Sequence, residues 1–267
     1  RKPVFIIHGM GGTVVVFTPL ADNLRGGFPI YAFEAQGIDG TLPPLESIEE
    51  MAALYIRHMQ TVDPSGPYRL IGYSGGGVIA LEMARQLTHR GREVELLVML
   101  DTLTPEAANR PIQVGRELKR FGEKVQTWVR LSPEELRRRA VSRTEKIYNG
   151  LVDLVKVKEP PPPKSHIEVL SDLCAEAYLR AQKVYDPGKY DGDIVLFRAE
   201  LAMMIAVRAG RLLGWDDVVT GKIDLITLQG ADHHSLLAEP AIHVIVEEIQ
   251  RRLTMLDAKR TRMLEEV

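Results

Sequence analysis

The sequence predicts an α/β fold, in which a mostly parallel central sheet is flanked by helices and interrupted by a helical insertion. Short apolar, β-prone runs alternate with helical patterns over the first hundred of the 267 residues. Residues 104–185 contain almost nothing strand-like, and strand-like runs return at residues 193–197 and 222–228. Strands that alternate with helices pair in parallel and are covered on both faces. The sequence therefore favours a core formed by residues 1–103 and 186–267, with residues 104–185 inserted as a helical lid.

The first part of the core contains four expected strands and three expected helices. The strands are expected at residues 4–7, 29–33, 68–71 and 95–100. The helices are expected at residues 17–24, 47–60 and 78–89. Ser47 and Glu50 form a capping box that opens the second of these helices, and Gly91 closes the third.

The expected insertion has the pattern of helices joined by an extended segment. Ser132 and Glu135 form a second capping box, with a proline at the first helical position. The consecutive prolines at residues 160–163 must be extended, and a helical pattern resumes over residues 166–183. A last helix is expected over residues 240–255, after the final strand.

The composition argues against several classes of protein. The net charge of −2 argues against a general nucleic-acid binder. No run of 18 apolar residues occurs, so we expect no transmembrane helix and no membrane partner. The single cysteine, Cys174, cannot form an internal disulfide and suits a reducing compartment, so we expect a cytoplasmic location. The chain begins at Arg1, almost inside a strand, which indicates a domain cut from a longer polypeptide.

A serine stands in a glycine-rich turn between an expected strand and an expected helix. The segment Gly72-Tyr73-Ser74-Gly75-Gly76 matches the pattern G-x-S-x-G. In that context the serine lies on a sharp turn at the carboxyl edge of a parallel sheet, where glycines let the neighbouring backbone pack closely. The next helix points its amino end at the site and favours developing negative charge there. Ser74 is therefore the predicted nucleophile, and a glycine-rich connection with a solvated serine is the alternative.

A serine hydroxyl needs a base, and the base needs an orienting carboxylate. His233 and His234 lie in a loop between the last expected strand and the last helix, at the sheet edge where Ser74 is expected. From the residues alone, either histidine fits as the base. Asp101 ends the strand after the helix of the serine, and Glu200 ends the next strand. Asp101 is the preferred acid, because its strand should lie beside that of the nucleophile.

A second glycine-rich loop, HGMGGT at residues 8–13, follows the first expected strand. Such a loop commonly supplies an N–H group that binds an oxyanion. The N–H groups of Met10 and Gly75 are the predicted oxyanion donors, and each such donor is typically worth about 3 kcal/mol in the transition state. A phosphate-binding role is disfavoured, because HGMGGT matches neither G-x-G-x-x-G nor the P-loop pattern.

The chain resembles the type I thioesterase domains that end polyketide synthases, nonribosomal peptide synthetases and animal fatty acid synthase. GPYRLIGYSGGGVIALEMARQL resembles the nucleophile region of that family, and HGMGGTVVVFTPLADNL resembles its first strand and oxyanion loop. YDPGKYDGDIVLFRA resembles the segment that leads out of the helical lid, and GADHHSLL resembles the loop of the catalytic histidine. The resemblance implies an α/β-hydrolase fold. It also aligns His233 rather than His234 with the catalytic histidine and places the acid at Asp101.

The same resemblance implies a reaction and a partner. A chain-terminating thioesterase receives an acyl, polyketide or peptidyl chain as a thioester on the phosphopantetheine arm of a carrier protein, here expected in the same polypeptide. Release is expected through an acyl-Ser74 intermediate, by hydrolysis or macrocyclisation, with no cofactor or metal. Tyr73, Leu201, Met204 and His234 are expected to line the substrate channel. No nucleic-acid partner is expected, and a homodimer is compatible with the sequence.

Three alternatives stay open from the sequence. A stand-alone editing thioesterase would place its acid one strand later, at Glu200. An unrelated serine esterase or lipase would prefer oxygen esters to thioesters. A hydrolase fold used only for binding would not need the hydroxyl of Ser74.

Overall fold

The computed structural model describes residues 1–24, 27–109, 164–201 and 209–265. The chain divides into two compact units, one formed by residues 1–110 with 166–267 and the other by residues 111–165. All strands and helices named below belong to the first unit.

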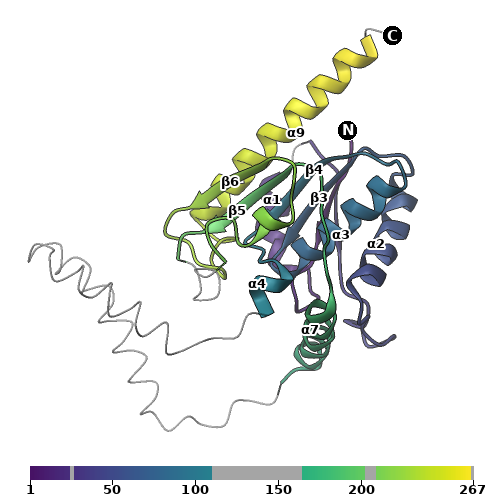
Figure 1. Ribbon diagram of the computed structural model, residues 1–267, viewed down its shortest axis with the longest axis vertical. Coiled ribbons are helices and arrows are strands. Elements are labelled where there is room, and N and C mark those ends of the chain that lie inside the picture. Colours follow the sequence, from purple (N-terminus) through teal and green to yellow (C-terminus); the bar gives the residue numbers. More distant parts are fainter. Residues whose placement is uncertain (25–26, 110–163, 202–208, 266–267) are drawn as a thin grey trace, which may run out of the picture. The chain divides into compact units, whose positions relative to one another are not determined.

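Within the described residues, six parallel strands form one central sheet (Figure 1). They are β1 (Val4–Ile7), β2 (Ile30–Phe33), β3 (Tyr68–Tyr73), β4 (Val94–Leu100), β5 (Ile194–Ala199) and β6 (Ile223–Leu228). Their order across the sheet is β2-β1-β3-β4-β5-β6, which confirms the predicted parallel sheet. Because the strand order reverses at β1, the carboxyl ends of β1 and β3 border the place where open α/β sheets bind ligands.

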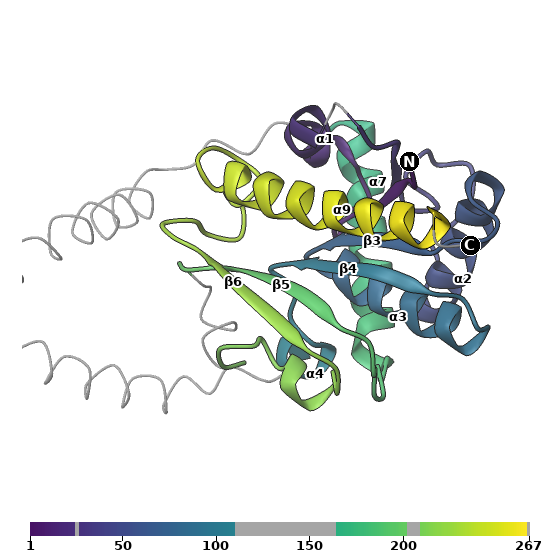
Figure 2. The ribbon, with the colours of Figure 1, turned by 90° about the horizontal axis from the view of Figure 1, so that it is seen from above.

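Helices cover both faces of this sheet, and Figure 2 shows α9 and α3 on opposite sides of the strands. The described α-helices are α1 (Thr18–Leu24), α2 (Ile48–Val62), α3 (Gly75–His89), α4 (Pro105–Asn109), α7 (His166–Val184) and α9 (Ala241–Glu265). Side chains of α2, α3 and α7 pack with Phe5 and Leu97 in one apolar core, whereas α1 and α9 pack with Ile6 and Val98 in another. Alternate residues of a strand therefore pack on opposite faces of the sheet. In the described parts of the chain, no helix is both long and apolar enough to cross a membrane.

Helix α9 continues well beyond its predicted end, to Glu265. Ion pairs with the sheet account for the extension. Arg69 Nε on β3 lies 2.6 Å from a carboxylate oxygen of Glu95 on β4, and Arg260 Nη2 on α9 lies 3.0 Å from the same carboxylate. Arg69 also pairs with Asp257 on α9. Because the Arg69 side chain is fully buried, these carboxylates offset the cost of burying its charge. Apolar periodicity does not report such pairs, so the sequence pattern ended the helix too early.

Helix α7 packs on the core, although the sequence assigned it to the insertion. Tyr178 and Tyr185 belong to the apolar core of α2 and α3, and the Tyr185 hydroxyl donates a hydrogen bond of 2.7 Å to Glu82 on α3. The core therefore resumes with α7 rather than after it. The second capping box and the proline run lie outside the described residues, and the assignment of residues 110–163 to a lid stays a prediction.

Candidate active site

Ser74 lies on the sharp turn between β3 and α3. Its backbone has φ 54° and ψ −124°, a conformation that L residues other than glycine rarely adopt. The Ser74 N–H donates a hydrogen bond of 2.9 Å to the carbonyl oxygen of Leu100 on β4. The Ser74 carbonyl accepts a hydrogen bond of 3.1 Å from the N–H of Gly77 on α3. Strand and helix thus hold the serine in its strained conformation at the carboxyl edge of the sheet.

The glycines around the serine leave no room for side chains. A Cβ atom at Gly72 would lie 2.4 Å from Gly77 Cα, and one at Gly76 would lie 2.2 Å from the carbonyl oxygen of His8, which follows β1. The close approach of α3 to the strands therefore requires glycine. Glycine is a poor helix former, so the sequence pattern placed the start of α3 almost a turn too late. The helix begins at Gly75.

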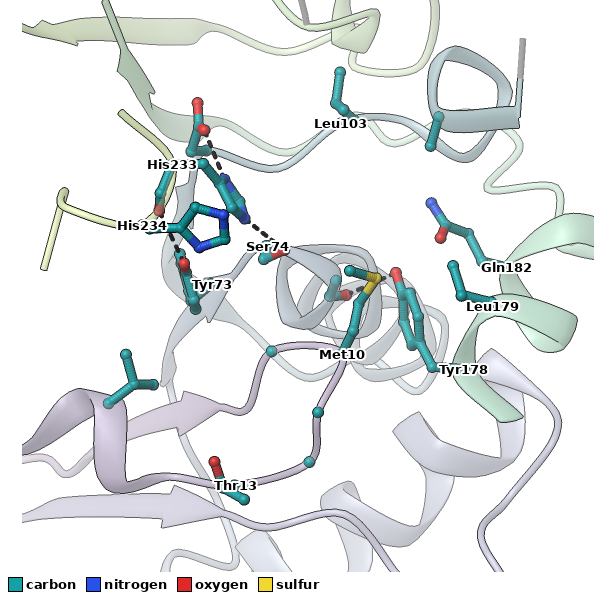
Figure 3. Close-up of a pocket in the computed structure, with 17 residues that line it drawn as sticks. Met10, Thr13, Tyr73, Ser74, Leu103, Tyr178, Leu179, Gln182, His233 and His234 are labelled. Atoms are coloured by element: carbon teal, nitrogen blue, oxygen red, sulfur yellow. Dashed lines mark hydrogen bonds and ion pairs between the residues drawn. The ribbon is translucent and has the colours of Figure 1, made fainter. Parts of the chain in front are cut away.

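Ser74, His233 and Asp101 form a continuous hydrogen-bonded series (Figure 3). His233 Nε2 lies 3.0 Å from Ser74 Oγ, and His233 Nδ1 lies 2.7 Å from Asp101 Oδ2. Because a carboxylate only accepts, Nδ1 carries the proton and Nε2 is free to accept the hydroxyl proton. The other oxygen of the buried Asp101 carboxylate accepts a hydrogen bond of 3.0 Å from the N–H of Ala199 on β5. Both oxygens of the carboxylate are therefore oriented.

The competing candidates for base and acid have other contacts. The ring of His234 lies edge-on to that of His233, with their centroids 5.5 Å apart. Glu200 accepts a hydrogen bond of 2.8 Å from the N–H of Gly230, at the start of the histidine loop. Of the alternatives that the residues left open, the structure brings His233 and Asp101 to the serine.

Tyr73 supports His233 in a way that the sequence did not reveal. The two rings stack with centroids 5.2 Å apart, and the Tyr73 hydroxyl donates a hydrogen bond of 2.9 Å to the His233 carbonyl. Burial raises the pKa of Tyr73 to about 12, so the hydroxyl stays protonated and donates at neutral pH. The first variable position of G-x-S-x-G, which Tyr73 occupies, carries no local signal for this contact, because its partner lies 160 residues further along the chain.

The loop after β1 borders the same site. The predicted oxyanion donors, Met10 and Gly75, both line the cavity that contains the serine. His8 anchors the start of this loop: its Nδ1 donates to the Gly9 carbonyl at 2.6 Å, and its Nε2 accepts from the Tyr55 hydroxyl at 2.6 Å. Burial lowers the pKa of His8 to about 4, so this imidazole is neutral at physiological pH. The sequence offered no reason to single out the pair of His8 and Tyr55.

A cavity of about 500 Å³ opens beside the serine. Val16, Leu103 and Leu179 contribute apolar walls, and the expected channel residues Tyr73 and His234 line the cavity as well. Figure 3 shows that α7 supplies one side of this space and the loop of the histidines another. The site can therefore hold an apolar chain with one end at the serine hydroxyl.

The structure does not place the other two expected channel residues, Leu201 and Met204, in the lining of the cavity. Leu201 is not among the residues that line the cavity, and its side chain is 49% exposed. The Leu201 N–H donates a hydrogen bond of 2.9 Å to the Ala231 carbonyl, which ties the residues after β5 to the histidine loop. The prediction for Leu201 is wrong, and Met204 lies outside the described residues.

Comparisons with known proteins identify relatives of this chain. The family model described as "Thioesterase domain" matches residues 2–253. The dimodular nonribosomal peptide synthase of Bacillus subtilis (strain 168) is 42% identical over 101 residues, which are 38% of this chain and 4% of that protein. The polyketide synthase PksR of the same organism is 31% identical over 200 residues, which are 71% of this chain and 8% of that protein.

A solved structure shares the fold. The crystal structure of holo-AB3403, a four-domain nonribosomal peptide synthetase bound to AMP and glycine, matches with a TM-score of 0.68 and 26% identity. The match covers 94% of this chain and 19% of that chain, so this chain spans less than a fifth of each of these three proteins. The α/β-hydrolase fold implied by the resemblance is confirmed. Since the family model extends over nearly the whole sequence, this chain belongs to the thioesterase domain family.

Proposed function

We propose that this chain is a chain-terminating thioesterase, which releases a carrier-bound acyl or peptidyl chain through an acyl-Ser74 intermediate. The observation that carries the proposal is the hydrogen-bonded series from Ser74 through His233 to Asp101, beside a largely apolar cavity. Membership of the thioesterase family supports a thioester substrate. The names of the relatives, a nonribosomal peptide synthase and a polyketide synthase, support a carrier-bound chain as its source.

In the first half-reaction, Ser74 Oγ attacks the thioester carbonyl carbon while His233 Nε2 takes the hydroxyl proton. Asp101 holds the Nδ1–H of the imidazole and stabilises its positive charge. The N–H groups of Met10 and Gly75 donate to the oxyanion, and the amino end of α3 favours its negative charge. The C–S bond then breaks, the pantetheine thiol leaves with the proton from His233, and the chain stays on Ser74 as an ester.

The second half-reaction transfers the chain to a new nucleophile. Water releases a free acid, whereas a hydroxyl or amine of the chain itself releases a ring. In either case His233 takes the proton of the nucleophile and returns it to Ser74 Oγ as the ester C–O bond breaks. In this scheme His233 carries out each proton transfer, and Asp101 and the backbone N–H groups stabilise the charges that develop. The scheme uses no cofactor.

The proposed partner is a carrier domain whose phosphopantetheine arm brings the chain to the serine. This chain covers 4% of one relative and 8% of another, so the carrier domain is proposed to lie in the same polypeptide. The cytosol is the proposed compartment, since Cys174 is a buried free thiol and suits a reducing environment.

Loss of the serine hydroxyl tests the proposal. Ser74→Ala is expected to lower kcat/KM for a synthetic acyl-pantetheine thioester by at least about 10⁴-fold. Intact-protein mass spectrometry should show that an acyl fluorophosphonate adds its mass to the wild type and not to this variant. Ser65→Ala is the matched control, because Ser65 is an exposed serine that does not line the cavity. Full activity of Ser74→Ala would mean that the fold is used for another purpose.

A second comparison separates a thioesterase from an unrelated esterase. The pantetheine thioester and a simple oxygen ester of the same acid are offered to the wild type, and the thioester is expected to react with the higher kcat/KM. A strong preference for the oxygen ester would contradict the proposal. With a thioester that carries a terminal hydroxyl, the product mass distinguishes the free acid from the ring.

A further inference from the structure

Gln182 on α7 contributes an amide to the cavity that contains Ser74. The residue is only 6% exposed. Figure 3 shows its side chain extending from α7 into the cavity, on the same side as Leu179. The proposed mechanism gives this amide no task, so its presence in the cavity needs a separate explanation.

The side chain of Gln182 differs from the other buried polar side chains of the described residues. Seven of these side chains have a hydrogen-bond partner, namely those of His8, Asp63, Arg69, Glu82, Asp101, Thr102 and Thr104. In the part of the chain that the structure describes, the side-chain amide of Gln182 has none. The Gln182 backbone carbonyl accepts a hydrogen bond of 3.4 Å from Asn109 Nδ2. The amide lines the cavity rather than being sealed in the core, so a ligand in the cavity can pair with it.

The surroundings of this amide restrict the ligand group that it can bind. Leu103, Ala108 and Leu179 line the same cavity and offer no polar side-chain atoms. The hydroxyl of Tyr178 also lines it, but that hydroxyl already donates a hydrogen bond of 3.1 Å to the Gly75 carbonyl. A glutamine amide presents an N–H donor and a carbonyl acceptor side by side. A ligand amide has the same two groups and pairs with it at two points, whereas a hydrocarbon chain satisfies neither.

The position of Gln182 on α7 indicates which part of the chain it meets. The residue lies one helical turn after Tyr178, and the Tyr178 hydroxyl contacts Gly75 directly beside the serine. Gln182 therefore meets the part of the chain that leads away from the reacting carbonyl along α7.

We propose that Gln182 is a specificity-determining residue, which selects acyl chains that carry an amide close to the reacting carbonyl. The inference rests on the proposed function, because it assumes that a thioester-borne chain occupies this cavity. It names the chemical class that the cavity prefers: amide-bearing chains over saturated hydrocarbon chains of equal length.

Two synthetic pantetheine thioesters of equal chain length test this preference. One carries a saturated chain, and in the other a secondary amide replaces two adjacent methylene groups in the half of the chain nearest the thioester carbonyl. Gln182→Leu keeps the approximate volume and removes both hydrogen-bonding groups. This variant is expected to lower kcat/KM by about tenfold for the amide substrate and by no more than about twofold for the saturated one. Leu179→Ala is the matched control, because it changes a neighbouring apolar wall and should affect both substrates alike.

The outcomes separate this inference from the proposed function. Release of neither chain by the wild type would overturn the proposed function. Release of both chains, with equal losses or no loss in Gln182→Leu, would overturn the inference alone. Gln182→Met is the second variant should Gln182→Leu fold poorly, and the same selective loss is expected from it.

Discussion

Tyr73 holds His233 by two contacts that reach different parts of the histidine. The tyrosine ring stacks on the imidazole at an angle of 20° between the planes, and its hydroxyl donates a hydrogen bond of 2.9 Å to the His233 carbonyl. The residue directly before Ser74 thereby fixes the loop that carries the proposed base. The proposed nucleophile, Ser74, and the residue that positions the proposed base, Tyr73, are therefore neighbours in one turn.

Two substitutions at Tyr73 separate these contacts. Tyr73→Phe keeps the stacking and removes the hydrogen bond, so kcat should fall about fivefold, the effect of one ordinary hydrogen bond. Tyr73→Leu removes both contacts and should lower kcat by about a further tenfold. Steady-state kinetics with an acyl-pantetheine thioester checks this, and KM should stay within about twofold because the expected loss is in positioning the base. A large rise in KM with unchanged kcat would instead indicate that Tyr73 serves only as a wall of the substrate channel.

Two substitutions test which carboxylate orients the imidazole of His233. Asp101→Asn should lower kcat/KM by about 10⁴-fold, because the amide no longer holds His233 in the tautomer that accepts the serine proton. Glu200→Gln should change kcat/KM by less than about threefold, since Glu200 contacts the backbone N–H of Gly230 rather than the imidazole. Both variants are compared with the wild type on the same thioester. Near-complete loss only in Glu200→Gln would favour an editing thioesterase whose acid lies one strand later.

The glycine packing predicts a large loss of stability at one position. Gly76→Ala places a Cβ 2.2 Å from the His8 carbonyl oxygen and 2.5 Å from that of Ile7, both backbone atoms that cannot move independently of β1. The free energy of unfolding should fall by about 3 kcal/mol. Gly91→Ala is the control: Gly91 has φ +67°, but nothing lies within 4 Å of an added Cβ, so only the cost of the backbone conformation is expected. Urea denaturation should show a loss of about 1 kcal/mol there, and equal losses at both sites would contradict the packing argument.

Burial of His8 predicts a dependence of stability on pH. Its pKa is about 4 in the folded chain, below the ordinary value of 6.5, so the unfolded chain binds a proton first as the pH falls. The contribution is therefore fully present above pH 6.5 and declines between pH 6.5 and pH 4. Between pH 7.5 and pH 5 the wild type should lose about 2 kcal/mol of unfolding free energy that His8→Gln does not lose. Urea denaturation at both pH values checks this, with His58→Gln, a change at an exposed histidine, as the control. The same pH response in all three proteins would show that another group is responsible.

Local patterns were sufficient for most of the fold. The capping box that opens α2 was readable because its partners are three residues apart, and the Ser47 hydroxyl does accept from the Glu50 N–H at 3.3 Å. Alternating strand and helix patterns predicted the parallel sheet, because each element buries its apolar face close to where it forms. The start of α3 and the carboxyl end of α9 were misplaced, since close glycine packing decides the first and distant ion pairs decide the second.

The sequence by itself determined that a serine stands on a strained turn at a sheet edge, because G-x-S-x-G, the strand before it and the helix after it are consecutive. Its residues left two histidines and two carboxylates open, and the family resemblance favoured His233 and Asp101. Only the tertiary structure decided which side chains meet: His233 reaches Ser74 across 159 residues and Asp101 across 132. Such contacts depend on how separate strands and loops meet at one edge of the sheet. Spacing along the chain does not encode the distances between such side chains. For the same reason, the position of the Gln182 amide in the cavity became visible only in the folded protein.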